Sequence, residues 1–284
     1  MDENLLIEFD DFLENIDNIP SLKPVPTKIL KLLKDENTDV KNLAELISKD
    51  PSLAANILKY ANSSFFGFKQ KITSIPQIIS LIGIREIKKL TLIYAIKSRV
   101  EKDLKGYGLT GKQIWKHSLS AAIGAQFLAQ LKGIYPTENA FTSGLLVDIG
   151  KIVLNDFIIK RNIKSIKDRE NIYKFHKIER EFFGIDHSEI AALLLEKWDF
   201  PEEIIISIRY HHRPSESPKY KKLTSVLHIA DLVSTASIFE LDVNDYETTI
   251  DSFALKSLKI KFYDLKELVD LMIEEIENAE KEFF

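Results

Sequence analysis

Residues 50–68 read DPSLAANILKYANSSFFGF, and this stretch says more about the fold than any other. Asp50 followed by Pro51 is a strong start signal for a helix, because aspartate caps free backbone N–H groups and proline suits the first helical position. Leu53 and Ile57 then lie four residues apart, on one face of that helix. The stretch therefore predicts a helix with one buried side.

The same helical periodicity continues along most of the chain. Ser74 with Gln77, and Thr110 with Gln113, have the spacing of capping boxes that open two further helices. Gly83 interrupts the first of these. Since no run of short alternating strands appears, the predicted fold class is all-α, with multiple helices in two packed lobes. Helices are expected around residues 29–33, 40–48, 51–61, 84–99, 137–158, 170–183, 187–198, 201–211, 220–236 and 262–280, and the capping box at Thr110 opens a helix of about twenty residues.

The segment KDLKGYGLTG, residues 102–111, is the best candidate for a boundary between the two lobes. It contains three glycines between two strongly helical regions, and glycine is a frequent breaker of regular structure. The chain of 284 residues is long enough for one large domain or two modest ones.

Composition excludes several classes of protein. The chain has no cysteine, which rules out disulfides, thiol catalysis and cysteine-based zinc sites. The net charge is −4 and no block of Lys or Arg stands out, so nucleic acid is not an expected partner. No apolar run approaches the ~20 residues of a membrane span, and the acidic start does not resemble a signal peptide. A cytoplasmic protein is expected.

The stretch GLLVDIGK, residues 144–151, places an acid in an apolar run. An unpaired carboxylate is costly to bury, so Asp148 needs a partner. One alternative is an ion pair with Lys151, three residues on; the other is a metal ligand. His117 lies on the buried side of its predicted helix, where it is either a hydrogen-bonded core residue or a ligand.

Four more side chains have two interpretations each. His187 begins a predicted helix, where the dipole disfavours protonation, and is either a surface residue or a ligand. His211 and His212 end a helix, where the dipole favours the charged form, so one of them is a candidate helix-end charge. Asp231 lies in an apolar helix and is either a ligand or a partner of His228. His176 is expected at the surface.

The order of these residues resembles that of the HD superfamily of metal phosphohydrolases, including the HD-GYP phosphodiesterases, with the pattern H…HDxGK…H…HH…D. The resemblance implies that His117, Asp148 and Asp231 hold one metal and that Lys151 contacts phosphate. It implies that a second metal is held by three histidines, His187, His211 and His212. Two departures stand out: Val147 replaces the histidine before the aspartate, and HHRPSESP at 211–218 lacks the glycine-rich GYP continuation.

Three stretches of the first half are similar to the HDOD domain, an HD-related output domain of bacterial signalling proteins. They are IPSLKPVPTKILKLL (19–33), LAELISKDPSLAANILKYANSSFFGF (43–68) and ITSIPQIISLIGIREIKKLTL (72–92). The resemblance implies an HDOD domain over 16–215, with lobes at 16–101 and 110–215. Residues 216–284 are expected to add helices that complete the second lobe.

Two functions follow from this resemblance. The first is a regulatory output domain without hydrolase activity, acting through signalling or regulatory proteins, because Val147 cannot bind a metal. The second is a metal-dependent phosphodiesterase acting on a nucleotide or cyclic dinucleotide, since a site built from Asp148, His187 and His211 or His212 needs nothing from residue 147. With the first function no cofactor is expected; the alternative is a divalent metal, Mn, Fe, Mg or Zn, at a degenerate HD site. A nucleotide that binds without turnover is an intermediate possibility.

Overall fold

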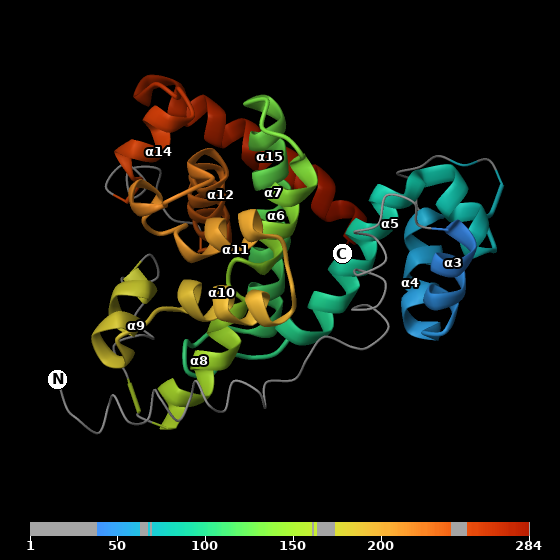
Figure 1. Cartoon of the computed structure of the whole chain (residues 1–284), viewed down its shortest axis with the longest axis horizontal. Helices are drawn as coiled ribbons and strands as arrows, with labels where there is room; N and C mark the ends of the chain where they lie inside the picture. Colours follow the sequence, from blue (N-terminus) through green and yellow to red (C-terminus); the bar gives the residue numbers. More distant parts are fainter. Residues whose placement is uncertain are drawn as a thin grey trace. The chain divides into compact units, whose positions relative to one another are not determined.

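The computed structural model describes residues 39–62, 68, 70–160, 162–163, 174–239 and 249–283. It divides into two compact units, one built mainly from residues up to Arg99 and the other comprising Val100–Glu277. Figure 1 shows the helices coloured along the chain. Two sequence features lie outside the described residues: the predicted helix around residues 29–33, and residues 63–67 of the stretch 50–68.

The first unit begins with α3 (Val40–Ser48) and α4 (Pro51–Ala61), which pack against each other. Both helices start as the sequence predicts. The side chain of Asp50 accepts hydrogen bonds from the first backbone N–H groups of α4, and Leu53 and Ile57 are buried. Burying such side chains is worth about 1.5–3 kcal/mol each, so the apolar face holds this helix in place.

Asn62, directly after α4, makes hydrogen bonds with its side chain to the end of α4 and to the segment before α5. The Asn62 side chain donates to the carbonyls of Leu58 and Ile72 at 2.8 Å, and accepts from the Ile72 N–H at 2.7 Å. The chain then enters α5 (Ile75–Val100). Gly83 interrupts α5 with φ 84° and ψ 162°, a conformation that only glycine adopts readily, as the sequence predicts.

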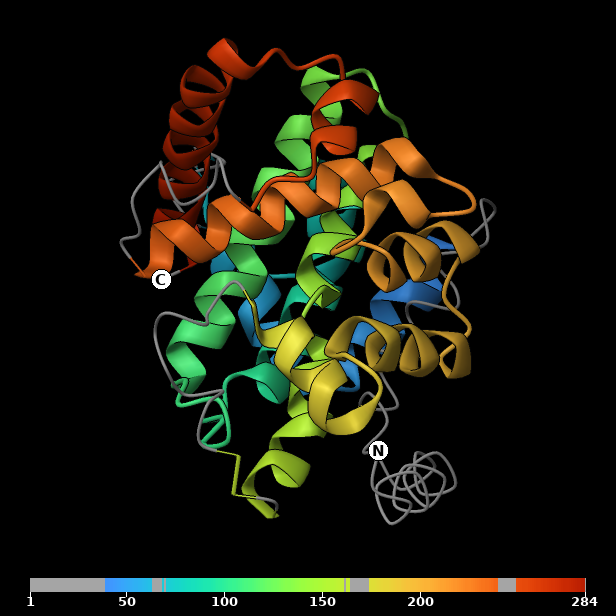
Figure 2. The same ribbon diagram turned by 90° about the vertical axis from the view of Figure 1, so that its left-hand side faces the viewer.

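The second unit is built around α6 (Gly111–Leu131), which packs against α7 (Thr137–Leu146) and α12 (Lys221–Phe239). Figure 2 shows α12, in orange, lying across the green helices. The predicted capping box of Thr110 and Gln113 opens α6. The other elements of this unit are α8 (Ile149–Lys160), α9 (Phe175–Phe183), α10 (His187–Lys197), α11 (Glu202–Arg209), η4 (Pro214–Glu216), α14 (Ser252–Ser257), η5 (Phe262–Asp264) and α15 (Leu265–Phe283).

The single helix predicted over 137–158 is wrong. Two helices, α7 and α8, are separated by a turn at Val147 and Asp148. The apolar run contains neither proline nor a helix-ending glycine at this point, so the local signal for a break is weak. Just before the break, α7 packs closely on α6: a Cβ on Gly144 would lie 2.4 Å from the backbone carbonyl oxygen of Ala121.

The predicted all-α class is confirmed. Within the described ranges there is no β-strand, only an isolated antiparallel bridge between Leu104 and Leu109. The sequence missed the short helix α14, and the helix expected over 262–280 begins with the 3-10 turn η5. Among the helices that the structure describes, none is both long enough and apolar enough to cross a membrane.

Candidate metal centre

The turn between α7 and α8 presents the central carboxylate of the site. Asp148 is 5% exposed, and its Oδ2 accepts a hydrogen bond from Lys151 Nζ at 2.7 Å. The same oxygen lies 3.2 Å from His117 Nδ1, and Oδ1 lies 3.3 Å from His187 Nε2. Asp148 thus lies between two groups of side chains that contain histidine.

The first group, which we call the mixed triad, consists of His117, Asp148 and Asp231. One ligand atom from each of the three lies within 4.8 Å of the others. His117 Nε2, on α6, lies 3.4 Å from Asp231 Oδ1 and 3.0 Å from Thr235 Oγ1, both on α12. Imidazole and carboxylate together form a ligand set that suits divalent transition metals.

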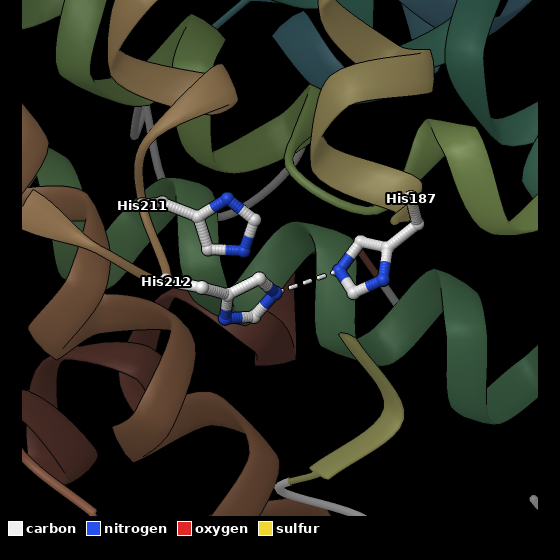
Figure 3. A group of neighbouring side chains, drawn as sticks. All are labelled: His187, His211 and His212. Carbon is white, nitrogen blue, oxygen red and sulfur yellow. Dashed lines mark hydrogen bonds between the residues drawn. The ribbon is translucent and has the colours of Figure 1, made fainter. Parts of the chain in front are cut away.

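The second group, the imidazole triad, consists of His187, His211 and His212 (Figure 3). His187 is the first residue of α10, and the other two follow the end of α11. The Nε2 atoms of His187 and His212 lie 2.9 Å apart. His211 Nε2 lies 4.0 Å from Asp231 Oδ2, so the two triads adjoin.

Two local features place His187. Asp186 caps α10, and its side chain accepts the backbone N–H groups of Ser188 and Glu189. A Cβ at Gly150 would lie 2.0 Å from the carbonyl oxygen of His187. Because any other residue would collide with this backbone, glycine lets α8 bring Asp148 close to the start of α10.

Asp148 and Lys151 form a buried ion pair, as one of the sequence alternatives predicts. Burial would raise the pKa of Asp148, but Lys151 and then His117 hold that pKa well below its usual range. Burial would lower the pKa of Lys151, but Asp148 outweighs this and raises it. Both groups are therefore charged, and losing one would leave the other buried without compensation.

The structure corrects three expectations for the histidines of the imidazole triad. His187 is 1% exposed, so the surface alternative is wrong. Burial would lower its pKa, but the Glu179 carboxylate, 2.6 Å from Nδ1, raises the pKa despite the helix dipole. For His211 and His212 burial lowers the pKa, so neither is the charged helix end that the dipole suggests.

The expected pairing of Asp231 with His228 is also wrong. His228 Nδ1 lies 2.8 Å from the His211 carbonyl oxygen, and its Nε2 accepts the Asp251 N–H at 2.9 Å. Both ring nitrogens are thus occupied by the backbone, which leaves Asp231 to face His117 and His211.

His176 is not the surface residue that the sequence suggests. Its ring stacks on that of His212, with centroids 4.1 Å apart and an interplanar angle of 14°. Burial lowers the pKa of His176 to about 3. His176 therefore lies against the imidazole triad without belonging to it.

Sequence reasoning missed Glu179, which is fully buried on α9 and contacts His187. A signal for it exists: Glu179 lies four residues after Phe175 and three before Phe182, on an otherwise apolar helix stripe. An acid in such a position is unusual, and the same reasoning does identify Asp231.

The residues fit a divalent metal by one structural test. Asp148 Oδ1, His117 Nδ1 and His211 Nε2 are buried, and none of them has a hydrogen-bond partner among the residues that the structure describes. Each instead lies 3.2–4.0 Å from a histidine or aspartate atom of the cluster. Buried polar atoms are nearly always hydrogen-bonded, so three such atoms within one cluster of histidines and aspartates suggest a bound ion. The two triads could therefore hold a metal, although Val147 gives the mixed triad no fourth ligand.

Comparison with known proteins identifies the family. The sequence model of the HDOD domain matches residues 19–214, so the chain belongs to the HDOD domain family. A protein of Treponema pallidum, named only as uncharacterized, is 29% identical over 226 residues, covering 77% of this chain and 42% of the relative. YuxH of Bacillus subtilis, also uncharacterized, is 35% identical over 140 residues, covering 49% of this chain and 32% of the relative. The chain spans less than half the length of both.

Solved structures share the fold. A crystal structure of an HDOD domain protein with unknown function from Geobacter sulfurreducens has a TM-score of 0.77 and 25% identity, and the match covers 99% of each chain. A second crystal structure, from Shewanella amazonensis and described as a "Putative phosphohydrolase", has a TM-score of 0.71 and 24% identity, covering 96% of this chain and 97% of the other. At that identity the second likeness supports the fold alone.

Proposed function

We propose that this HDOD chain is a cytoplasmic regulatory domain that acts through protein partners, and that its His/Asp cluster binds a divalent metal without hydrolysing a phosphate ester. The observation that carries the proposal is the replacement of a ligand by Val147 next to a cluster that keeps its other polar groups. A valine side chain can neither coordinate a metal nor transfer a proton.

The burial of the cluster supports a role without turnover. His187 is 1% exposed and His211 is 0% exposed. Catalytic metal sites keep an open position for water and substrate, whereas structural sites are closed. Lys151, the candidate phosphate contact, is held instead by Asp148, and its Nζ lies 5.4 Å from the centre of the Phe175 ring.

The imidazole triad, with Asp148 beside it, would hold the metal. Imidazole ligands favour zinc, iron or nickel over magnesium. A bound metal supplies positive charge that joins side chains from three places in the sequence. The chain's own residues orient this group: Gly150 lets α8 approach, and Asp186 caps the helix that begins with His187.

The test is a metal and turnover measurement on protein purified without chelator. We expect a bound transition metal that is lost in His187→Ala, and no hydrolysis of cyclic dinucleotides with added Mn²⁺. The matched control is His176→Phe, which removes the ring nitrogens beside the triad but keeps a stacked ring; it should retain the metal. Turnover in the native protein that disappears in His187→Ala would overturn the proposal.

The second candidate is a metal-dependent phosphohydrolase acting on a nucleotide or cyclic dinucleotide. One observation favours it: Asp148 Oδ1 lies 3.3 Å from His187 Nε2, so a site between Asp148 and the imidazole triad needs nothing from Val147. The same turnover assay separates the two functions, because only this candidate predicts a hydrolysed product.

The partner proteins are tested by cross-linking in native extract, with metal-loaded and metal-stripped chain as bait. Because the metal would join helices that carry the cluster, we expect capture of a signalling or regulatory protein to differ between the two baits. Identical capture with both would show that the cluster does not control partner binding.

A further inference from the structure

Glu179 is a buried carboxylate at the outer side of the imidazole triad. Its side chain is fully buried on α9. Oε2 accepts the backbone N–H of His187 at 2.7 Å and lies 2.6 Å from the Nδ1 of the same residue. Oε1 accepts the hydroxyl of Tyr107 at 2.7 Å. One carboxylate therefore contacts both the backbone and the ring of a single histidine.

These contacts determine where the hydrogen of the His187 ring lies. An ionised carboxylate only accepts hydrogen bonds, so at 2.6 Å the facing Nδ1 must carry a hydrogen. In a neutral imidazole the other nitrogen, Nε2, then has a free lone pair. That Nε2 points toward His212 and Asp148, at 2.9 Å and 3.3 Å. Because Glu179 also raises the pKa of His187, this neutral form is reached only above that raised pKa; in it, the hydrogen in the contact between the two Nε2 atoms is carried by His212.

Tyr107 holds Glu179 in this position. Burial, and then the Glu179 charge, raise the pKa of Tyr107 well above its usual value, so its hydroxyl stays a donor. The Tyr107 ring also meets Phe175 of α9 edge to face, with centroids 5.3 Å apart. Phe175 and Glu179 are the buried residues of α9. Phe175 and Glu179 thus add an aromatic contact and a carboxylate to the other contacts that hold α9 at the site.

We propose that Glu179 is a positioning residue that fixes His187 in the Nδ1–H form, so that the Nε2 lone pair faces the cluster, and that Tyr107 fixes Glu179 in turn. The part that concerns metal affinity rests on the proposed function above; the part that concerns the hydrogen position does not. Carboxylates that orient a metal-binding histidine typically change metal affinity by about 10–100-fold when they are removed.

The first test reads the hydrogen position in the native chain without metal, by NMR of protein labelled with ¹⁵N at histidine. At a pH above the raised pKa of His187, we expect its Nδ1 to show the shift of a nitrogen that carries hydrogen and its Nε2 that of a bare nitrogen. His187→Gln assigns the signals. The opposite tautomer in the metal-free native chain would overturn the proposal, whether or not the protein binds metal.

The second test compares Zn²⁺ affinity among three variants. Glu179→Gln keeps the shape and removes the charge, and we expect affinity to fall about 10–100-fold, together with a mixed tautomer at His187. Tyr107→Phe removes only the hydroxyl and should cause a smaller loss in the same direction. The matched control is Glu181→Gln, an exposed position on the same helix, which should bind as the native chain does.

The outcomes separate the two proposals. If the native chain binds no Zn²⁺, the metal part of the proposed function fails, and the tautomer measurement still decides the role of Glu179. If the native chain binds Zn²⁺ and Glu179→Gln binds it equally well with an unchanged His187 tautomer, the positioning role is wrong. Should Glu179→Gln not fold, Tyr107→Phe and the native spectrum decide.

Discussion

The mixed triad and the imidazole triad adjoin in one helical unit but differ in what supports them. The mixed triad of His117, Asp148 and Asp231 has the valine beside its carboxylate, where the wider HD pattern has a histidine. The imidazole triad keeps all three of its rings and has Glu179 against His187. In the proposed site, the missing ligand therefore belongs to the mixed triad, and the imidazole triad has all of its members.

Asp148 joins the two halves, and its removal should have the largest effect. In Asp148→Ala the buried Lys151 loses its partner, which typically costs about 3–5 kcal/mol of unfolding free energy. Urea denaturation measures this loss. In the double variant with Lys151→Met much of the stability should return. The control is Asp156→Ala, at an exposed position on α8, where a change within about 0.5 kcal/mol is expected. Equal changes at both positions would show that the ion pair is not buried as described.

Gly150→Ala tests how the imidazole triad is placed. The new Cβ would meet the His187 carbonyl oxygen at 2.0 Å, so backbone must shift. Overpacking of this kind costs about 1–3 kcal/mol, and we expect weaker metal binding as well. Gly124→Ala is the control, because its Cβ would meet the flexible end of Met272 at 3.2 Å. If denaturation and metal titration give the same stability and the same metal affinity for both variants, the close approach of α8 to α10 is contradicted.

Val147→His tests whether the mixed triad lacks only a ligand. The added imidazole should let the mixed triad bind a metal of its own. The gain in metal affinity should exceed the ~10-fold that residues outside the ligand set contribute at least. Isothermal titration would show an added binding event. Val147→Leu adds bulk without a ligand atom and is the control, since overpacking alone costs about 1–3 kcal/mol. No added event in a folded Val147→His variant would mean that residue 147 does not face the triad.

His176 should have the smallest effect. Its stacked contact with His212 suggests a packing role, and aromatic contacts of this kind are worth about 0.5–1.5 kcal/mol. His176→Ala should lose roughly this much stability, whereas His176→Phe should keep it, as thermal unfolding can measure. A loss of metal in His176→Phe would instead make this ring part of the imidazole triad.

Most of the fold can be predicted from the sequence because its helix ends carry strong local signals. Asp50 with Pro51 and Thr110 with Gln113 cap helices where expected, and Gly83 interrupts one. The break at Val147 and Asp148 carries no such signal. It follows a tertiary contact, the close approach of Gly144 to Ala121, which the local sequence does not reveal.

The candidate site was predictable as a set of residues but not in its electrostatics. The order of the histidines and acids identifies which side chains come together. The pKa directions expected for His187, His211 and His212 came from the helix dipole alone, and burial or a nearby carboxylate outweighs it. Glu179 lies on the apolar stripe of its helix with Phe175 and Phe182, a signal that the sequence interpretation did not use.

The most direct measurement of the central claim is the number of Zn²⁺ ions bound per chain in His187→Ala and in His117→Ala. If the imidazole triad is the complete half of the cluster, the native chain binds one tight ion, His117→Ala keeps it and His187→Ala loses it. If the native chain binds none, or if His117→Ala loses the ion while His187→Ala retains it, the account is wrong.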